Sequence, residues 1–221
     1  MIVVVGGAGY IGSTMVETLL AEDREVLVVD DLSLGHRWAV PEHVELVETD
    51  MADVQVIEEI AREYDVEAVM HFSALAKVGE SMEQPRRYWR ENFQKSKRMI
   101  DAWFEQGIEN FIFSSSAATY GEPDEIPITE EEVAEPINPY GRTKRAVEWY
   151  LEDLHERFGV RSVSLRYFNA AGAGDRVGEV HDPETHLIPL VLQAATGERD
   201  IIEIYGTDYP TRDGTCLRDF V

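Results

Sequence analysis

The sequence contains very little cysteine and no long apolar run. Its single cysteine, Cys216, has no partner for an internal disulfide, which fits a reducing compartment. No apolar run reaches the length of about 20 residues that a membrane-spanning helix needs. Met1 leads directly into the residues IVVVGG, without the positively charged segment and cleavage site of a secretory signal. We therefore expect a cytoplasmic protein.

Basic residues are also scarce. The chain has 20 lysines and arginines against 43 aspartates and glutamates, which gives a formal net charge of -23. Such a field repels nucleic-acid phosphates and anionic lipids, so neither nucleic acid nor a membrane is an expected partner. The acidic residues are spread along the chain, which is typical of a solvated surface. The 6 histidines form no i, i+4 pair and have no neighbouring cysteine, so we predict no metal site.

What the sequence does contain is a regular alternation of β-branched runs and amphipathic segments. This alternation is typical of parallel strands joined by crossover helices. The predicted fold class is therefore α/β, a doubly wound parallel sheet of the Rossmann type, whose ligands bind at the carboxyl ends of the strands. Strands are expected at residues 2–5, 25–30, 44–49, 68–73, 110–115 and 161–168, and helices at residues 11–20, 54–64, 88–105 and 140–158.

Three glycines, Gly6, Gly9 and Gly12, follow the first predicted strand and open a helix. A tight turn, close approach of the backbone to a pyrophosphate, and helix packing all favour glycine at such positions. The next strand ends at Asp30, whose carboxylate can accept both hydroxyls of an adenosine ribose and repels a 2′-phosphate. The pattern predicts binding of NAD rather than NADP. Asp50, which ends the third strand, either reaches the adenine or is an ordinary turn residue.

Tyr140 and Lys144 are four residues apart in the segment NPYGRTK, so they share one face of the predicted helix. An ammonium group beside a phenol lowers the phenol pKa, which would let Tyr140 act as a base near neutral pH. The run FIFSSSAATYG places Ser114, Ser115 and Ser116 at the end of a strand, where a hydroxyl can hydrogen-bond a substrate oxygen. Each motif alone is common, so the hypothesis rests on their combination.

The glycine trio, Asp30, the serine run and the Tyr-x-x-x-Lys motif, in this order, resemble the extended short-chain dehydrogenase/reductase family. The stretches GGAGYIGS, HFSALAKVGES, NPYGRTK, LRYFNAAGA and GTDYPTRDGTCLRDF narrow the resemblance to its UDP-sugar 4-epimerases. The resemblance implies an NAD-dependent isomerase that interconverts UDP-glucose and UDP-galactose through a 4-keto intermediate. It also implies an NAD-binding domain at residues 1–175 and a partial substrate-binding region at residues 176–221.

The resemblance also implies roles for individual residues. Ser116, Tyr140 and Lys144 would be catalytic. The residues implied to contact NAD are Gly6, Gly9, Tyr10, Ile11, Gly12, Asp30, Asp31, Asp50, Met51, Phe72, Asn92, Lys144 and Phe168. Those implied to contact the UDP-sugar are Asn169, His186, Leu187, Tyr205 and Arg218, each of which could instead serve packing or surface solvation. A homodimer is implied, paired through the helices at 88–105 and 140–158, with Trp89, Phe93, Trp103, Phe104, Trp149 and Tyr150 as candidate contacts.

Three features bear on this resemblance. The segment FQKSKRM after Asn92 lacks the small residues expected there, and the chain ends at Val221 within a motif that continues in family members. We therefore expect weak UDP-sugar binding and low or absent epimerase activity. Ala117 and Ala118 lie where sugar-nucleotide dehydratases need an acid pair, which argues against dehydration. A non-catalytic NAD-binding protein and an epimerase of another UDP-sugar stay open as alternatives.

Overall fold

The computed structural model describes residues 1–123, 125–181, 183–204 and 206–221. The chain divides into two compact units, Met1–Tyr167 and Phe168–Val221. This division comes slightly earlier in the chain than the boundary predicted after residue 175. Each unit is described by itself below.

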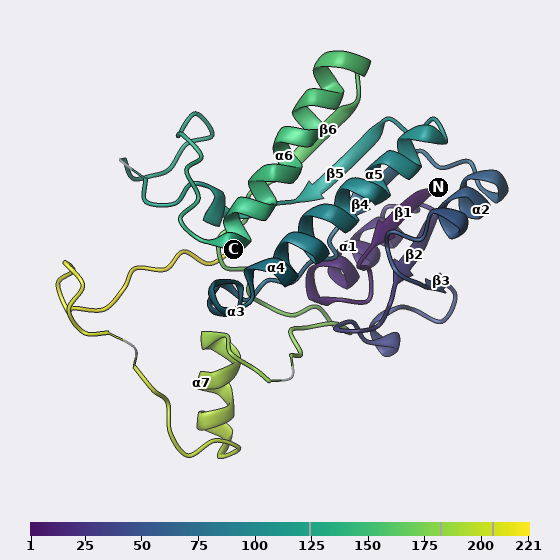
Figure 1. Cartoon of the computed structure of the whole chain (residues 1–221). Helices are drawn as coiled ribbons and strands as arrows, with labels where there is room; N and C mark the ends of the chain where they lie inside the picture. Colours follow the sequence, from purple (N-terminus) through teal and green to yellow (C-terminus); the bar gives the residue numbers. More distant parts are fainter. Residues whose placement is uncertain (124, 182, 205) are drawn as a thin grey trace. The chain divides into compact units, whose positions relative to one another are not determined.

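The first unit is built on a parallel sheet of six strands in the order β3-β2-β1-β4-β5-β6 (Figure 1). This order confirms the predicted doubly wound fold, and it reverses direction between β1 and β4. At such a reversal the connections leave on opposite sides, which opens a crevice at the carboxyl ends of the two strands. The strands are β1 (Ile2–Val5), β2 (Val26–Asp30), β3 (Glu45–Glu48), β4 (Ala68–His71), β5 (Asn110–Ser114) and β6 (Arg161–Leu165).

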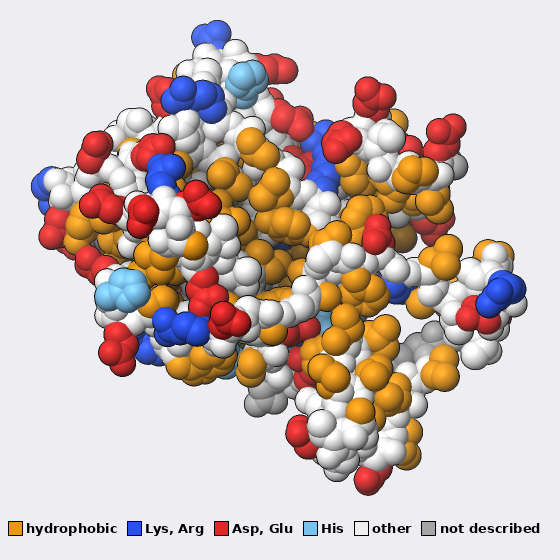
Figure 2. Space-filling view, turned by 180° about the vertical axis from the view of Figure 1, so that it is seen from behind, with side chains coloured by type: hydrophobic (Ala, Val, Ile, Leu, Met, Phe, Trp, Pro, Cys, Tyr) orange, Lys and Arg blue, Asp and Glu red, His pale blue; other side chains and the backbone are white. Residues whose placement is uncertain are grey.

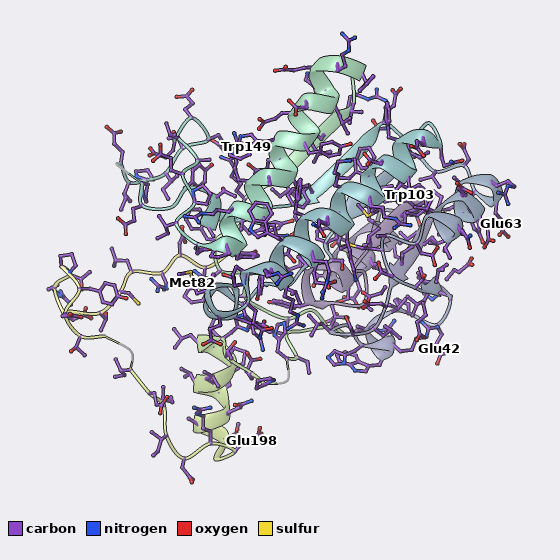
Figure 3. The ribbon with its side chains drawn as sticks, viewed as in Figure 1. Glu42, Glu63, Met82, Trp103, Trp149 and Glu198 are labelled. Carbon is purple, nitrogen blue, oxygen red and sulfur yellow. The ribbon has the colours of Figure 1, made fainter. Side chains whose placement is uncertain are left out.

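Helices cover both faces of this sheet, and the pleat of β1 shows how the core is divided. Val3 and Val5 belong to a large apolar cluster that includes Trp103, which is labelled in Figure 3. Ile2 and Val4 point to the opposite face and join a second cluster. The first cluster contains side chains from α2, α5 and α6, and the second contains side chains from α1. The helices of this unit are α1 (Tyr10–Ala21), α2 (Val54–Glu63), α3 (Val78–Glu83), α4 (Pro85–Tyr88), α5 (Lys95–Glu105) and α6 (Pro139–Phe158), with short helical turns η1 (Arg37–Ala39) and η3 (Ala117–Thr119).

The helix predicted at residues 88–105 is interrupted. Between α4 and α5 lies η2 (Trp89–Gln94), a π-helical segment that the sequence pattern did not indicate. π-Helical turns insert an extra residue and are frequent at functional sites. Here Asn92 is 1% exposed, and its side chain makes two hydrogen bonds to the backbone of Leu75. Its oxygen accepts from the Leu75 nitrogen, and its nitrogen donates to the Leu75 oxygen, both at 2.9 Å. The interruption thus fixes the loop that follows β4.

α6 begins and ends where the sequence predicts. The Asn138 side chain accepts a hydrogen bond from the Gly141 nitrogen at 2.8 Å, and Pro139 is the first helical residue. Gly159 ends the helix with a φ of 79°, a left-handed conformation that glycine adopts without strain. These two ends place Tyr140 in the first turn of α6.

Within its described residues, the second unit contains one helix, α7 (Leu187–Thr196), which was not predicted from the sequence. None of its side chains is buried, and Leu187 and Leu192 are more than half exposed. Its apolar surface forms part of the orange area low in Figure 2. Within the described residues of both units, no helix is long and apolar enough to cross a membrane.

A buried ionic cluster ties α6 to the carboxyl ends of β5 and β6. The Glu148 carboxylate is 2% exposed and accepts hydrogen bonds from Ser115 at 2.5 Å, from Arg145 at 2.9 Å and from Arg166 at 2.7 and 3.0 Å. Burial raises the pKa of Glu148, but the hydrogen bonds from Arg166 and Ser115 outweigh it, so the pKa lies below its usual value. The carboxylate is therefore charged and saturated with donors.

Replacing Glu148 with alanine should lower the free energy of unfolding by about 3–5 kcal/mol, because two guanidinium groups lose a buried counter-ion. Urea unfolding measures this loss. The matched control is Glu152→Ala, since Glu152 also pairs with Arg145, at 2.6 Å, but is 54% exposed. That change should cost less than about 1 kcal/mol. Equal losses in the two variants would contradict the role given to Glu148.

Candidate functional site

The turn between β1 and α1 has no room for side chains. Gly6 has a φ of +81°, and a Cβ added there would lie 2.5 Å from the Ser73 nitrogen. A Cβ on Gly12 would lie 2.1 Å from the Gly6 oxygen, so α1 packs directly on the turn. These contacts agree with the packing functions that the sequence pattern predicts for the first and third glycines.

The middle glycine has a different environment. Gly9 is the N-cap of α1 and makes no side-chain cap, and an added Cβ would meet only the Gly6 oxygen, at 3.4 Å. The first backbone N–H groups of a helix lack partners within the helix, and the helix dipole favours negative charge at this end. A pyrophosphate therefore fits the start of α1, where Tyr10 and Ile11 are the first helical residues.

Asp30, at the end of β2, is only 9% exposed and is held by the backbone on both oxygens. Oδ2 accepts from the Ala8 nitrogen at 3.0 Å, and Oδ1 accepts from the Leu32 nitrogen at 2.9 Å. Burial raises the pKa of Asp30, although these two backbone bonds act in the opposite direction. A carboxylate has about four acceptor positions, so two stay available for a ribose diol. The fixed orientation supports the predicted role of Asp30.

The end of β3 borders a pocket of about 530 Å³, lined by Asp50, Ala52, Asp53, Arg90, Gln94, Lys95 and Arg98. Asp50 accepts from the Ala52 nitrogen at 2.9 Å, which is the geometry of a turn residue. Its other oxygen pairs with Lys95 at 2.5 Å. Burial raises the pKa of Asp50, but the Lys95 bond outweighs it and the pKa is lowered. Asp50 thus has the hydrogen bond of a turn residue and also lines a pocket. Its contact with adenine stays a prediction.

The remaining residues predicted to contact the cofactor occupy separate positions. Asp31 is exposed and accepts from the Ser33 backbone and hydroxyl at 2.9 and 2.6 Å. Met51 is 9% exposed and belongs to the larger apolar core cluster. Phe72 follows β4 and its backbone nitrogen bonds the Val5 oxygen, so it borders the crevice. Phe168 belongs to the second unit and is 39% exposed.

Ser116, Tyr140 and Lys144 meet at the carboxyl end of β5. Tyr140 and Ser116 form a side-chain hydrogen bond, and the Ser116 hydroxyl also accepts from the Ala118 nitrogen at 3.1 Å. Lys144 Nζ donates to the Ser114 oxygen at 2.7 Å and lies 5.9 Å from the centre of the Tyr140 ring. The expected convergence of the three side chains is therefore present in the first unit.

The expected lowering of the Tyr140 pKa is not found. Burial raises the pKa of Tyr140, and the Ser116 hydrogen bond offsets only part of this effect. Burial also lowers the pKa of Lys144 to about 7, although Glu148 acts in the opposite direction. Sequence spacing could not reveal this because it gives the relative position of two groups and not their desolvation. Near neutral pH, Lys144 is close to its own titration point, and Tyr140 is a neutral phenol.

The residues predicted to contact the UDP-sugar belong to the second unit, except that Tyr205 lies outside the described residues. The Asn169 amide donates to the Asp219 oxygen at 2.7 Å. Arg218 is exposed and donates to the Leu217 oxygen, and Leu187 opens α7 with 53% exposure. His186 Nδ1 pairs with Glu179 and Glu184 at 2.8 and 2.9 Å. Their contacts with a UDP-sugar stay predictions.

Four residues at the site were not singled out from the sequence. Gly7 packs on Val28, where a Cβ would lie 2.8 Å from the nearest methyl, and Gly35 lies against Ala8 and Asp30, with a Cβ 2.9 Å from Oδ1. The doubled glycine in VVVGGAG was the available signal for Gly7. Lys95 and Glu148 pair with groups far away in the sequence, and no local pattern marks such partners.

Comparison with known proteins gives consistent matches over the whole chain. The model of the NAD dependent epimerase/dehydratase family matches residues 2–221. The UDP-glucose 4-epimerase of Corynebacterium glutamicum is 46% identical over 220 residues, which cover 100% of this chain and 66% of that relative. The chain therefore spans slightly less than two thirds of the length of the curated relatives compared first.

Two solved structures agree in fold. The crystal structure of UDP-glucose 4-epimerase from Brucella ovis in complex with NAD is 48% identical, with a TM-score of 0.95, over 100% of this chain and 68% of that chain. The crystal structure of UDP-glucose 4-epimerase from Bifidobacterium longum in complex with NAD+ and UDP is 33% identical, with a TM-score of 0.93, over 100% and 69%.

The depressed pKa of Lys144 makes stability depend on pH. Between about pH 7 and pH 10.5 the unfolded chain holds a proton on Lys144 that the folded chain has lost, so rising pH stabilises the folded protein. Lys144→Met removes this dependence. As pH rises across this window, the free energy of unfolding of the variant minus that of the original protein should therefore fall by about 1 kcal/mol per pH unit.

Urea unfolding of NAD-free protein at several pH values between 7 and 10 measures this difference. Lys97→Met is the matched control, because the Asp101 hydrogen bond raises the pKa of Lys97 and its titration lies above the window. A pH-independent difference for Lys144→Met would show that Lys144 keeps an ordinary pKa.

Proposed function

Because the chain belongs to the NAD dependent epimerase/dehydratase family, we propose that it binds NAD and interconverts UDP-glucose and UDP-galactose. The observation that carries this proposal is the meeting of Ser116, Tyr140 and Lys144 at the carboxyl edge of the sheet. The same edge carries the glycine turn after β1 and Asp30 after β2. A dinucleotide site and a proton-transfer group therefore share one side of the first unit.

The residues of the first unit fit NAD. Gly9 leaves the start of α1 open for the pyrophosphate, and Asp30 offers two acceptor positions to the ribose. Asp50 lines the pocket where we place the adenine, and Met51 follows it in the sequence. Asn92 holds the loop after β4, and Lys144 offers a donor at the end of β5. Bound NAD supplies a positively charged ring that accepts the hydrogen of sugar C4 with its electron pair and later returns it.

In the proposed reaction, the ionised form of Tyr140 takes the proton of the sugar C4 hydroxyl while the C4–H bond breaks, which leaves a 4-keto sugar. Ser116 hydrogen-bonds Tyr140 and can donate to the same sugar oxygen. Positive charge nearby lowers a phenol pKa, so the charged form of Lys144 favours Tyr140 as the base. Tyr140 then returns the proton to the oxygen after the hydrogen has reached the other face of C4. Atoms and electrons balance over the cycle, and the product differs only in configuration.

The substrate side is proposed from residues of the second unit. Arg218 matches a diphosphate with paired hydrogen bonds, and Asn169, His186 and Leu187 are proposed to contact the sugar nucleotide. Ala117 and Ala118 form η3 beside Ser116 and carry no acid, which supports epimerisation over dehydration.

We also propose a homodimer in the cytoplasm. Trp89 and Trp149 are 38% and 53% exposed on η2 and α6, which suits them to a contact between two copies. Trp103 was a candidate for the same surface, but it is 1% exposed and belongs to the core. The proposed dimer contact therefore relies on Trp89 and Trp149 and not on Trp103.

The first expected outcome concerns cofactor choice. NAD should bind at least about tenfold more tightly than NADP, because placing a 2′-phosphate against the Asp30 carboxylate juxtaposes like charges. Calorimetric titration with each nucleotide measures the ratio. Asp30→Ser should reduce the preference, whereas Asp153→Ser on the exposed face of α6 should not. Equal affinities in the original protein would overturn the role of Asp30.

The second expected outcome concerns catalysis. Tyr140→Phe should lower turnover of UDP-galactose to UDP-glucose by about 10²–10⁴-fold without loss of bound NAD, since only the ionisable oxygen is removed. Tyr150→Phe is the control on the same helix, where the hydroxyl bonds Asp101. Near-normal turnover in Tyr140→Phe would place the base elsewhere. If the original protein holds NAD but converts no UDP-sugar, the non-catalytic alternative is favoured. If it converts only a UDP-sugar other than UDP-glucose and UDP-galactose, it is an epimerase of that sugar.

A further inference from the structure

Two glutamates and two histidines of the second unit converge just before α7. They are Glu179, His181, Glu184 and His186, and one donor atom from each lies within 4.8 Å of the others. His186 Nδ1 is 2.8 Å from Glu179 Oε1 and 2.9 Å from Glu184 Oε1. His181 Nδ1 is 3.4 Å from Glu179 Oε1 and 3.8 Å from Glu184 Oε2. Each of the four side chains thus offers a potential ligand atom in one small region.

These separations suit a metal ion. A tetrahedral zinc ion with bonds of about 2.0–2.1 Å holds its ligand atoms about 3.3 Å apart. The four distances given above, which involve both oxygens of Glu184, range from 2.8 to 3.8 Å and lie on both sides of this value. The two imidazole rings are 4.8 Å apart between centroids and tilted by 49°, so both nitrogens can face one ion without the rings stacking.

One ligand is already held in position by the backbone. Glu184 Oε1 accepts from the nitrogens of Thr185 and His186 at 2.7 and 2.8 Å, and the Glu184 side chain is 8% exposed. Its Oε2 faces His181. Glu179 is 12% exposed. Outer contacts of this kind orient ligands at metal sites and reduce the reorganisation that binding requires.

We propose that Glu179, His181, Glu184 and His186 bind one zinc ion. Imidazole nitrogens favour zinc and its neighbours over calcium and magnesium, and carboxylates complete a set that zinc accepts. The ion also offsets the repulsion between two carboxylates that lie close together. Four protein ligands leave no position open for a substrate, so the site is structural and fixes the segment that leads into α7.

No metal site was predicted from the sequence because no two histidines are four residues apart and none has a neighbouring cysteine. His181 and His186 are five residues apart in an irregular segment, and the ligands follow the pattern Glu-x-His-x-x-Glu-x-His. His186 binds the ion through Nδ1, which leaves Nε2 for the sugar contact proposed above. Zinc binding itself does not depend on NAD or on epimerisation.

Calorimetric titration of zinc chloride into the chelator-treated 221-residue chain tests this proposal. We expect one ion per chain, and cobalt should give the visible absorption bands of a tetrahedral site that zinc then removes. His181→Ala and Glu184→Gln should each weaken zinc binding by more than about tenfold, since loss of even an outer-shell partner costs about 10–100-fold. His43→Ala is the control, because His43 is exposed and lies in the first unit.

NAD content is measured in every variant to show that the first unit is folded. Zinc binding without NAD binding would contradict only the proposed function. No stoichiometric zinc binding by the original protein would overturn the site, as would unchanged affinity in both His181→Ala and Glu184→Gln. If one of these variants fails to fold, the other decides the outcome.

Discussion

The bonds around Glu148 determine where the catalytic side chains can be. This one carboxylate accepts hydrogen bonds from Ser115 after β5, from Arg166 after β6 and from Arg145 on α6. Glu148 lies one helical turn beyond Lys144, so anchoring it also sets the depth of Lys144 and Tyr140 against the sheet. A buried charge held by several donors is a demanding arrangement, because removing one partner leaves the others desolvated. The geometry of the site therefore depends on a residue that touches no proposed reactant.

Burial at this edge has opposite effects on the two titrating residues. It makes the neutral forms of both Tyr140 and Lys144 more favourable, which raises one pKa and lowers the other. The ordinary pKa values of the two groups are nearly equal, so these shifts move them apart, and transfer of a proton from the phenol to the amine requires more free energy than in water. The positively charged ring of bound NAD would lower the pKa of Tyr140 and so favour the ionised form that the proposed reaction needs.

Much of the first unit follows from the sequence because its signals are local. Apolar runs located the strands, Asn138 and Gly159 located the ends of α6, and the spacing of Tyr140 and Lys144 placed them on one face. The π-helical segment around Asn92 was not predicted, since helical periodicity does not reveal an extra residue in one turn. The pKa shifts and the cluster at Glu179 were missed for a related reason. They depend on burial and on contacts that only the folded chain creates.

The pleat of β1 has a consequence for how the sheet is aligned. In most sheets a slip of one residue would expose apolar side chains to water, and this penalty specifies strand pairing. Ile2, Val3, Val4 and Val5 are all buried, so a slip of β1 exchanges one apolar side chain for another. Hydrophobicity alone therefore does not align this strand. The close approach of Gly6 to the backbone that follows β4 favours the observed register, because a side chain in place of Gly6 would lie 2.5 Å from the Ser73 nitrogen. Gly6, which belongs to the turn proposed for the cofactor, thus also favours the observed alignment of the central strand against β4.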